Sequence, residues 1–138
     1  MRQAIEERME NQIMKARVYN AIFDVAVAAV EEASSGTASQ VSDNQFNVNI
    51  ENLSISTVCY DSDYSVITVG IDYQTTEVNT RVADLSINID GTYEENYHSI
   101  PRAIRATVFN IIDNVIDEVT SFIDSYDPNA VSSGDSEQ

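Results

Sequence analysis

Apolar residues recur at steps of three or four over the first part of the chain, as in Ile5, Met9, Ile13, Phe23 and Val30. This period predicts an amphipathic helix over residues 3–33. Charged residues crowd its first half, whereas Val and Ala fill its second half. We therefore expect the second half to pack on the core of the protein.

Small polar residues follow over 34–45 and predict a loop. The apolar period then changes to two, which predicts strands over about 46–58, 64–73 and 78–90, joined by turns at 60–64 and 74–77. In the first strand the apolar phase moves from Ile50 to Leu53, and we expect a bulge near Glu51 and Asn52. The third strand carries a second phase shift. Together these segments predict a three-stranded antiparallel meander.

A second helix is predicted over residues 100–126, with Ser99 as its N-cap and Pro101 in its first turn. Its apolar stripe runs from Ile104 to Tyr126, and Ile112, Ile116 and Ile123 widen it beyond the arc of about 100° that one packing face requires. We expect the extra width to meet the first helix or another subunit. Residues 127–138 hold too little apolar surface to order, and predict a disordered acidic tail.

The order of elements defines the expected fold class. A helix, three strands and a helix, with both helices on one face of a small sheet, give an α+β two-layer sandwich. Residues 1–126 form a single α+β domain by this interpretation, because a chain of 138 residues has the length of one domain.

Charge sets this chain apart. Seven Lys and Arg residues, Lys15 being the only lysine, stand against 23 Asp and Glu, for a formal net charge of −16. Such a charge opposes compaction unless molar salt, a basic partner or divalent cations screen it. The acids are scattered along the whole chain, which favours adaptation to salt, and the surface resembles that of proteins from extreme halophiles. An ordinary acidic phage or bacterial protein is the alternative.

Several charges oppose the dipoles of the predicted helices. Arg102 and Arg105 lie in the first turns of the second helix and Asp124 near its end, where each costs about 0.3 to 1 kcal/mol at low salt and little in concentrated salt. The two arginines either dock on acids of a neighbouring copy or pair with acids of their own chain. The candidate interface comprises Arg102, Arg105, Ile112, Ile116 and Ile123.

Candidate chemistry is sparse. Cys59 and His98 are the only residues of their types, and no motif surrounds either one, so we expect both to be structural. The segment from Asp61 begins like a calcium loop, but Val66 stands where glycine is needed and Asp72 where glutamate is expected, which favours a polar turn. We predict no catalytic residue, no cofactor and no metal, and therefore no enzyme.

The same composition bears on partners and location. An acidic surface repels the phosphate backbone, so direct binding to nucleic acid is not expected. The N-terminus carries acids where a signal peptide is apolar, and the stretch 23–30 is too short to span a bilayer. We expect a cytoplasmic or virion protein that does not bind membranes.

The order of elements over residues 3–126 resembles that of the neck, tail-completion and tail-terminator proteins of tailed viruses. The resemblance implies a non-enzymatic structural or assembly protein with protein partners, as a homo-oligomer or part of a larger assembly. It assigns no functional residue. The alternative from another class is an acidic nucleic-acid mimic that inhibits a DNA-binding host protein.

Overall fold

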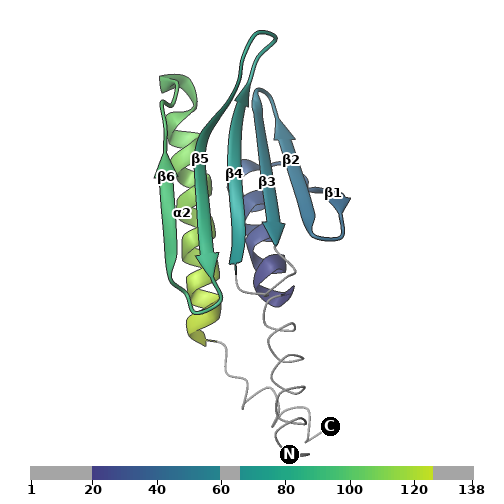
Figure 1. The fold of residues 1–138 in the computed structure, drawn as a ribbon, viewed down its shortest axis with the longest axis vertical. Helices are drawn as coiled ribbons and strands as arrows, with labels where there is room; N and C mark the ends of the chain where they lie inside the picture. Colours follow the sequence, from purple (N-terminus) through teal and green to yellow (C-terminus); the bar gives the residue numbers. More distant parts are fainter. Residues whose placement is uncertain (1–19, 60–65, 126–138) are drawn as a thin grey trace, which may run out of the picture.

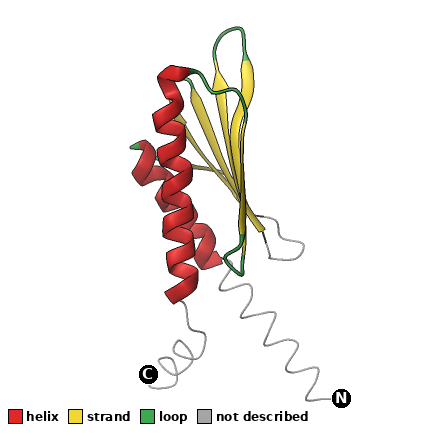
Figure 2. Cartoon of the chain, turned by 90° about the vertical axis from the view of Figure 1, so that its left-hand side faces the viewer, coloured by secondary structure: helices red, strands yellow, loops and turns green. Residues whose placement is uncertain are grey.

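The computed structural model describes residues 20–59 and 66–125. In this part of the chain, two helices cover one face of a six-stranded antiparallel sheet (Figure 1, Figure 2). The N-terminal helix is described over residues 20–34. The other elements are β1 (Ser39–Ser42), β2 (Gln45–Ile50), β3 (Leu53–Cys59), β4 (Val66–Gln74), β5 (Asn79–Asn88), β6 (Tyr93–Tyr97) and α2 (Arg102–Ser125). The α+β class is confirmed.

The sheet is a meander in which each strand pairs with its neighbour in sequence, in the order β1 to β6. The prediction of three strands was wrong. The segment 46–58 forms two strands, because Ile50 pairs with Leu53 and Glu51 takes a left-handed φ of 47°. Where a bulge was expected, Glu51 and Asn52 therefore make a two-residue turn, and the chain reverses.

The two edge strands, β1 and β6, were also missed. β1 lies inside the segment 34–45 that was predicted as a loop, and β6 follows the last predicted strand. All four residues of β1 and four of the five in β6 are exposed, so neither strand carries an apolar alternation. The second phase shift is a real irregularity: Ile71 pairs with Ala83 but Asp72 pairs with Arg81, so Val82 is an extra residue on β5.

The core lies between the sheet and the helices. The N-terminal helix packs near β2, where the rings of Phe23 and Phe46 are 5.8 Å apart, and α2 packs near β6, where the rings of Tyr97 and Phe109 are 4.9 Å apart. Alternate residues of the central strands point into this layer and are almost fully buried, among them Ile55, Ile67, Val69, Ile71, Leu85 and Ile87.

The wide apolar stripe of α2 is used inside the chain. Ile112 is 0 % exposed and Ile116 is 9 % exposed, and Ile123 packs against the core at its margin. The Asn114 side chain on the same helix donates hydrogen bonds to the Ala29 carbonyl and to a Glu32 carboxylate oxygen, at 2.9 and 3.1 Å. Of the two expectations for this side, contact with the first helix is the one found, and Ile112 and Ile116 are not free to contact another subunit.

The boundaries of the helices agree with the sequence to within two residues where they are described. α2 begins at Arg102, directly after Pro101, whose carbonyl accepts a hydrogen bond from the Ile104 amide at 3.1 Å. The predictions for the helix over 3–19, for the turn at 60–64 and for the tail at 127–138 lie outside the described residues. Neither described helix is both long enough and apolar enough to cross a membrane.

Candidate functional site

The face of the sheet that the helices leave uncovered is polar and largely uncharged. Its register places Ser, Thr, Asn and Gln side chains opposite the buried positions of β2, β3 and β4. We call the part over β2, β3 and the first half of β4 the neutral patch, because it carries no charged residue. The patch consists of Gln45, Asn47, Asn49, Ser54, Ser56, Val58, Val66, Thr68 and Gly70.

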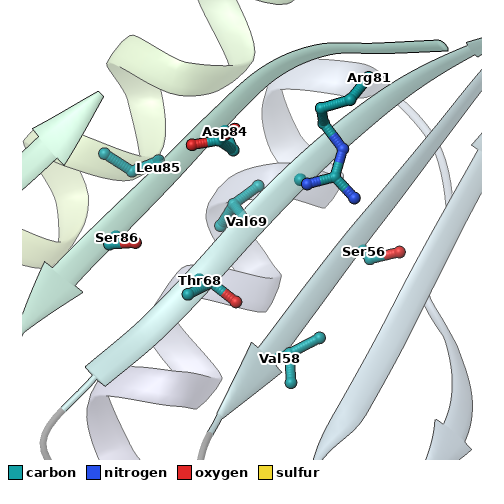
Figure 3. A pocket seen from close by; sticks show the side chains of 9 residues that line it. Ser56, Val58, Thr68, Val69, Arg81, Asp84, Leu85 and Ser86 are labelled. Carbon is teal, nitrogen blue, oxygen red and sulfur yellow. The ribbon is translucent and has the colours of Figure 1, made fainter. Parts of the chain in front are cut away.

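A hollow of about 250 Å³ lies on this open face, over β3, β4 and β5 (Figure 3). Ser56, Thr68 and Ser86 line it with hydroxyl groups, and Val58 gives it an apolar wall. Arg81 is the only Lys or Arg on the six strands, and its side chain enters the hollow. The site therefore joins one cation to three neutral hydroxyls.

Gly70 makes room for the Arg81 guanidinium. A Cβ at position 70 would lie 2.5 Å from Nη1 and 2.6 Å from Cζ of Arg81. The guanidinium therefore lies against the backbone of β4, at a place where any side chain would displace it. An isolated glycine inside a strand often marks such a close approach.

Asp72 orients the arginine from one side. The Arg81 Nε donates a hydrogen bond to Asp72 Oδ1, and the two residues are direct partners in the β4–β5 register. Among the described residues, Arg81 makes this hydrogen bond through Nε and none through its two Nη groups, and Figure 3 shows the tip of the guanidinium pointing into the hollow. Nε is engaged, and the paired Nη donors remain available.

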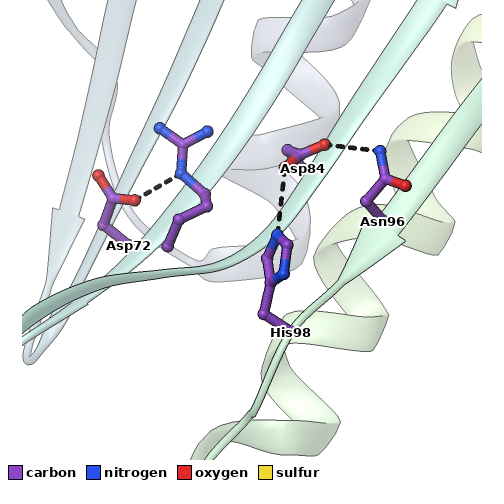
Figure 4. Close-up of polar contacts among 5 residues, drawn as sticks. Asp72, Asp84, Asn96 and His98 are labelled. Atoms are coloured by element: carbon purple, nitrogen blue, oxygen red, sulfur yellow. Dashed lines mark hydrogen bonds and ion pairs between the residues drawn. The ribbon is translucent and has the colours of Figure 1, made fainter.

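Asp84 also lines the hollow, and its side chain has polar neighbours on the side of β6. Asn96 Nδ2 donates to Asp84 Oδ1 at 3.0 Å, and His98 Nε2 lies 3.7 Å from Asp84 Oδ2 (Figure 4). Both partners come from β6 and the residue that follows it. The hollow thus sits between two carboxylates, each held by its own polar partner.

The structure separates Cys59 from His98. Cys59 is buried in the core at the end of β3, whereas His98 is exposed on the open face beyond β6. Cys59 lies level with Tyr93 across three strand spacings, and His98 lies five residues beyond Tyr93, which amounts to a separation of about 22 Å. The two side chains therefore cannot form a nucleophile and base pair.

The charges at the two ends of α2 oppose its dipole, as the sequence predicted. Its first turn holds no acid and its last turn no base, and Arg102 and Arg105 are both exposed. Arg105 Nη2 donates to the Ile100 carbonyl at 3.4 Å, and neither arginine forms an ion pair with a described residue. Pairing with acids of the same chain, one of the two expectations, is thus not found in the part described.

The calcium-like segment can be followed only in part. Asp61 and Asp63 lie outside the described residues, while Asp72, at the twelfth position of that segment, binds Arg81 instead. In the described ranges, no three His, Cys, Asp or Glu side chains gather where a metal ion would sit.

Sequence reasoning missed Arg81, Gly70 and their hollow. Arg81 and Asp72 meet because of the irregularity at Val82, and the phase shift that indicated it does not say which residue of the neighbouring strand Arg81 pairs with. Besides that phase shift, the available signal was Gly70, an isolated glycine in a strand of apolar alternation.

Comparison of the chain with protein-family models, with curated proteins and with solved structures finds no match. Inference about its function therefore starts from the geometry and charge of its own surface.

Proposed function

We propose that this chain is a non-enzymatic assembly protein that works in concentrated salt and binds a second copy of itself through the open face of its sheet. The observation that carries the proposal is the neutral patch. In a chain with a formal net charge of −16, it offers a surface on which another copy can lie without bringing acids together. A virion neck or tail of a virus with a halophilic host is the setting we propose.

The size of the open face suits a dimer. The strands are 4 to 10 residues long, and at a rise of about 3.4 Å per residue and a spacing of about 4.8 Å they give a face of roughly 700 Å². A stable interface buries about 800 Å² on each partner. The open face therefore comes close to the area that one partner buries in an interface of standard size.

Symmetry removes the remaining repulsion. A two-fold axis near β4 would lay the neutral patch of one copy over β5 and β6 of the other. Asp84 and Glu94 of each copy would then face Asn and Ser side chains. This arrangement keeps Asp84 and Glu94 of one copy away from the same acids of the other, while Asp72, on β4 near the axis, is paired with Arg81 of its own chain in each copy.

Salt acts mainly on the two helices, which carry many exposed acids. Asp113, Asp117 and Glu118 are exposed on α2, and Asp24 and Glu32 are exposed on the N-terminal helix beside it. Their mutual repulsion, and the charges that oppose the dipole of α2, are screened when the Debye length falls to about 3 Å in molar salt. Concentrated salt thus favours both folding and assembly.

Sedimentation in potassium chloride from about 0.1 M to about 3 M tests the proposal. We expect oligomers at high salt and smaller or partly unfolded species at low salt. Asn49→Glu adds an acid to the exposed edge of the neutral patch and should weaken association at least about tenfold. Ser121→Glu adds the same charge on the exposed side of α2 and should associate like the unmodified chain.

A monomer at every salt concentration would overturn the assembly proposal. If that monomer also stays folded at low salt and binds a basic DNA-binding protein most tightly there, the acidic mimic takes its place. Equal association of Asn49→Glu and Ser121→Glu would place the interface away from the open face.

A further inference from the structure

The Arg81 hollow has the features of an anion site that is already oriented. Asp72 holds Nε and so fixes the plane of the guanidinium, and Gly70 lets that plane lie against the strand. Fixing a long side chain in advance lowers the entropy that a ligand must overcome on binding. The two Nη groups are thus presented together on one side of the hollow.

The shape of these donors selects a planar anion. Two parallel N–H groups of a guanidinium match the two oxygens of a carboxylate, and hydroxyl groups can donate to the same oxygens. Ser56, Thr68 and Ser86 supply hydroxyls around the hollow, and Val58 can contact a short apolar stem. At about 250 Å³ the hollow is smaller than the usual site for a cofactor or drug-sized ligand.

The neighbouring acids select a singly charged ligand. Asp72 and Asp84 flank the guanidinium, so a second negative charge on the ligand would face two carboxylates. Phosphate and sulfate carry that second charge near neutral pH, whereas a simple carboxylate does not. The same acids keep the affinity modest.

From these contacts we infer that the hollow binds one carboxylate group, held in two hydrogen bonds by the Nη groups of Arg81. The carboxylate belongs either to a free small molecule or to an acidic side chain of a second copy of this chain. The inference does not depend on the proposed self-association, because a monomer presents the same hollow.

Nuclear magnetic resonance titration of the full chain with sodium acetate tests the site. At constant ionic strength, the amides of Thr68 and Gly70 and the Nε of Arg81 should shift and saturate. Sodium chloride and sodium phosphate should give smaller shifts that do not saturate over the same range. Equal responses to acetate and chloride would overturn the carboxylate assignment.

Four variants distinguish binding by the paired donors of the Arg81 guanidinium from attraction to positive charge in general. Arg81→Gln and Gly70→Ala should each weaken acetate binding at least about tenfold, the first by removing the donors and the second by displacing them. Arg81→Lys keeps the charge but loses the paired donors, and should bind with intermediate affinity. Arg102→Gln removes a charge from the start of α2 and should bind like the unmodified chain.

Folding of each variant is checked by circular dichroism under the same conditions. If Arg81→Gln unfolds, Arg81→Lys takes its place because it keeps the positive charge. Weaker acetate binding by Arg81→Lys than by Arg102→Gln then supports the site. Unchanged acetate binding in folded Arg81→Lys and Gly70→Ala would overturn the site.

Sedimentation with and without acetate distinguishes the two sources of the carboxylate. Saturating acetate should dissociate the assembly if a side chain of a second copy occupies the hollow, and should leave the mass unchanged if the ligand is a free molecule. A chain that is monomeric and binds acetate would refute the proposed function and leave this site standing.

Discussion

The two faces of the sheet share the same strands and differ in almost every side chain. Ile55, Ile71 and Leu85 are buried on the covered face, and their direct neighbours Ser56, Gly70 and Ser86 line a hollow on the open face. One face excludes water and holds the fold together, whereas the other leaves small polar groups within reach of a partner. Adjacent residues of one strand therefore serve different purposes: one is buried in the core, and the next is open to a partner.

Two glycines make the same contrast in detail. A Cβ at Gly36 would lie 2.5 Å from Val48 Cγ1 and 2.9 Å from Ile50 Cγ2, which belong to the covered face. A Cβ at Gly70 would meet the Arg81 guanidinium at a similar distance, but on the open face. A core side chain cannot move aside without disturbing its neighbours, whereas the end of an exposed arginine can.

The largest effect is expected on the covered side. Ile111→Asp places a carboxylate at a position that is 0 % exposed, and we expect it to unfold the domain because a buried charge without a partner costs several kcal/mol. Asn110→Asp adds the same charge at the exposed neighbouring position of α2 and should melt within a few degrees of the unmodified chain. Thermal melting followed by circular dichroism measures both. A melting temperature of Ile111→Asp equal to that of the unmodified chain would mean that Ile111 does not lie in the core.

The glycines give a smaller, graded effect. Gly36→Ala should lower the free energy of unfolding by roughly 1 to 3 kcal/mol, the usual cost of overpacking a core. Gly70→Ala should change it by less than about 1 kcal/mol, because the ion pair that it disturbs is partly exposed. Urea titrations at one salt concentration provide the comparison. Equal losses in the two variants would contradict the separation of the faces.

The smallest effect concerns alkaline pH at the margin of the covered face. Burial of the Tyr97 phenol, followed by its hydrogen bond to Glu95, raises the pKa of Tyr97 above its usual value of about 10. A raised pKa means that this contribution to stability is complete below about pH 10 and is lost as the pH rises further. The free energy of unfolding should therefore fall above about pH 10.

Two tyrosine variants isolate that contribution. Tyr97→Phe should remove part of the alkaline loss, whereas Tyr93→Phe, on the exposed part of the same strand, should leave it in place. Urea titrations between about pH 8 and pH 11 compare them. A steeper alkaline loss in Tyr97→Phe than in the unmodified chain would reverse the assigned sign.

Sequence patterns predicted the strands and helices that bury one face. The alternation from Ile67 to Tyr73 predicted β4, and the stripe from Ile104 to Phe122 predicted α2, because each element hides one face. The edge strands β1 and β6 gave no such pattern, since both are exposed almost throughout. The turn at Glu51 looked like a bulge because a phase shift alone does not distinguish the two. The Arg81 hollow depends on register, which local sequence does not encode.

The meander order of the strands carries a consequence for how the chain reaches its fold. Every strand pairs with its neighbour in sequence, so the whole sheet can grow by adding hairpins, each of which closes a short loop at small entropic cost. The hydrogen bond from Asn114 to the Ala29 carbonyl instead joins residues 85 positions apart. Contacts of such separation form late in folding because they close long loops. Until the two helices dock, the apolar side of the sheet is exposed, and that interval is when a newly made chain is most prone to aggregate.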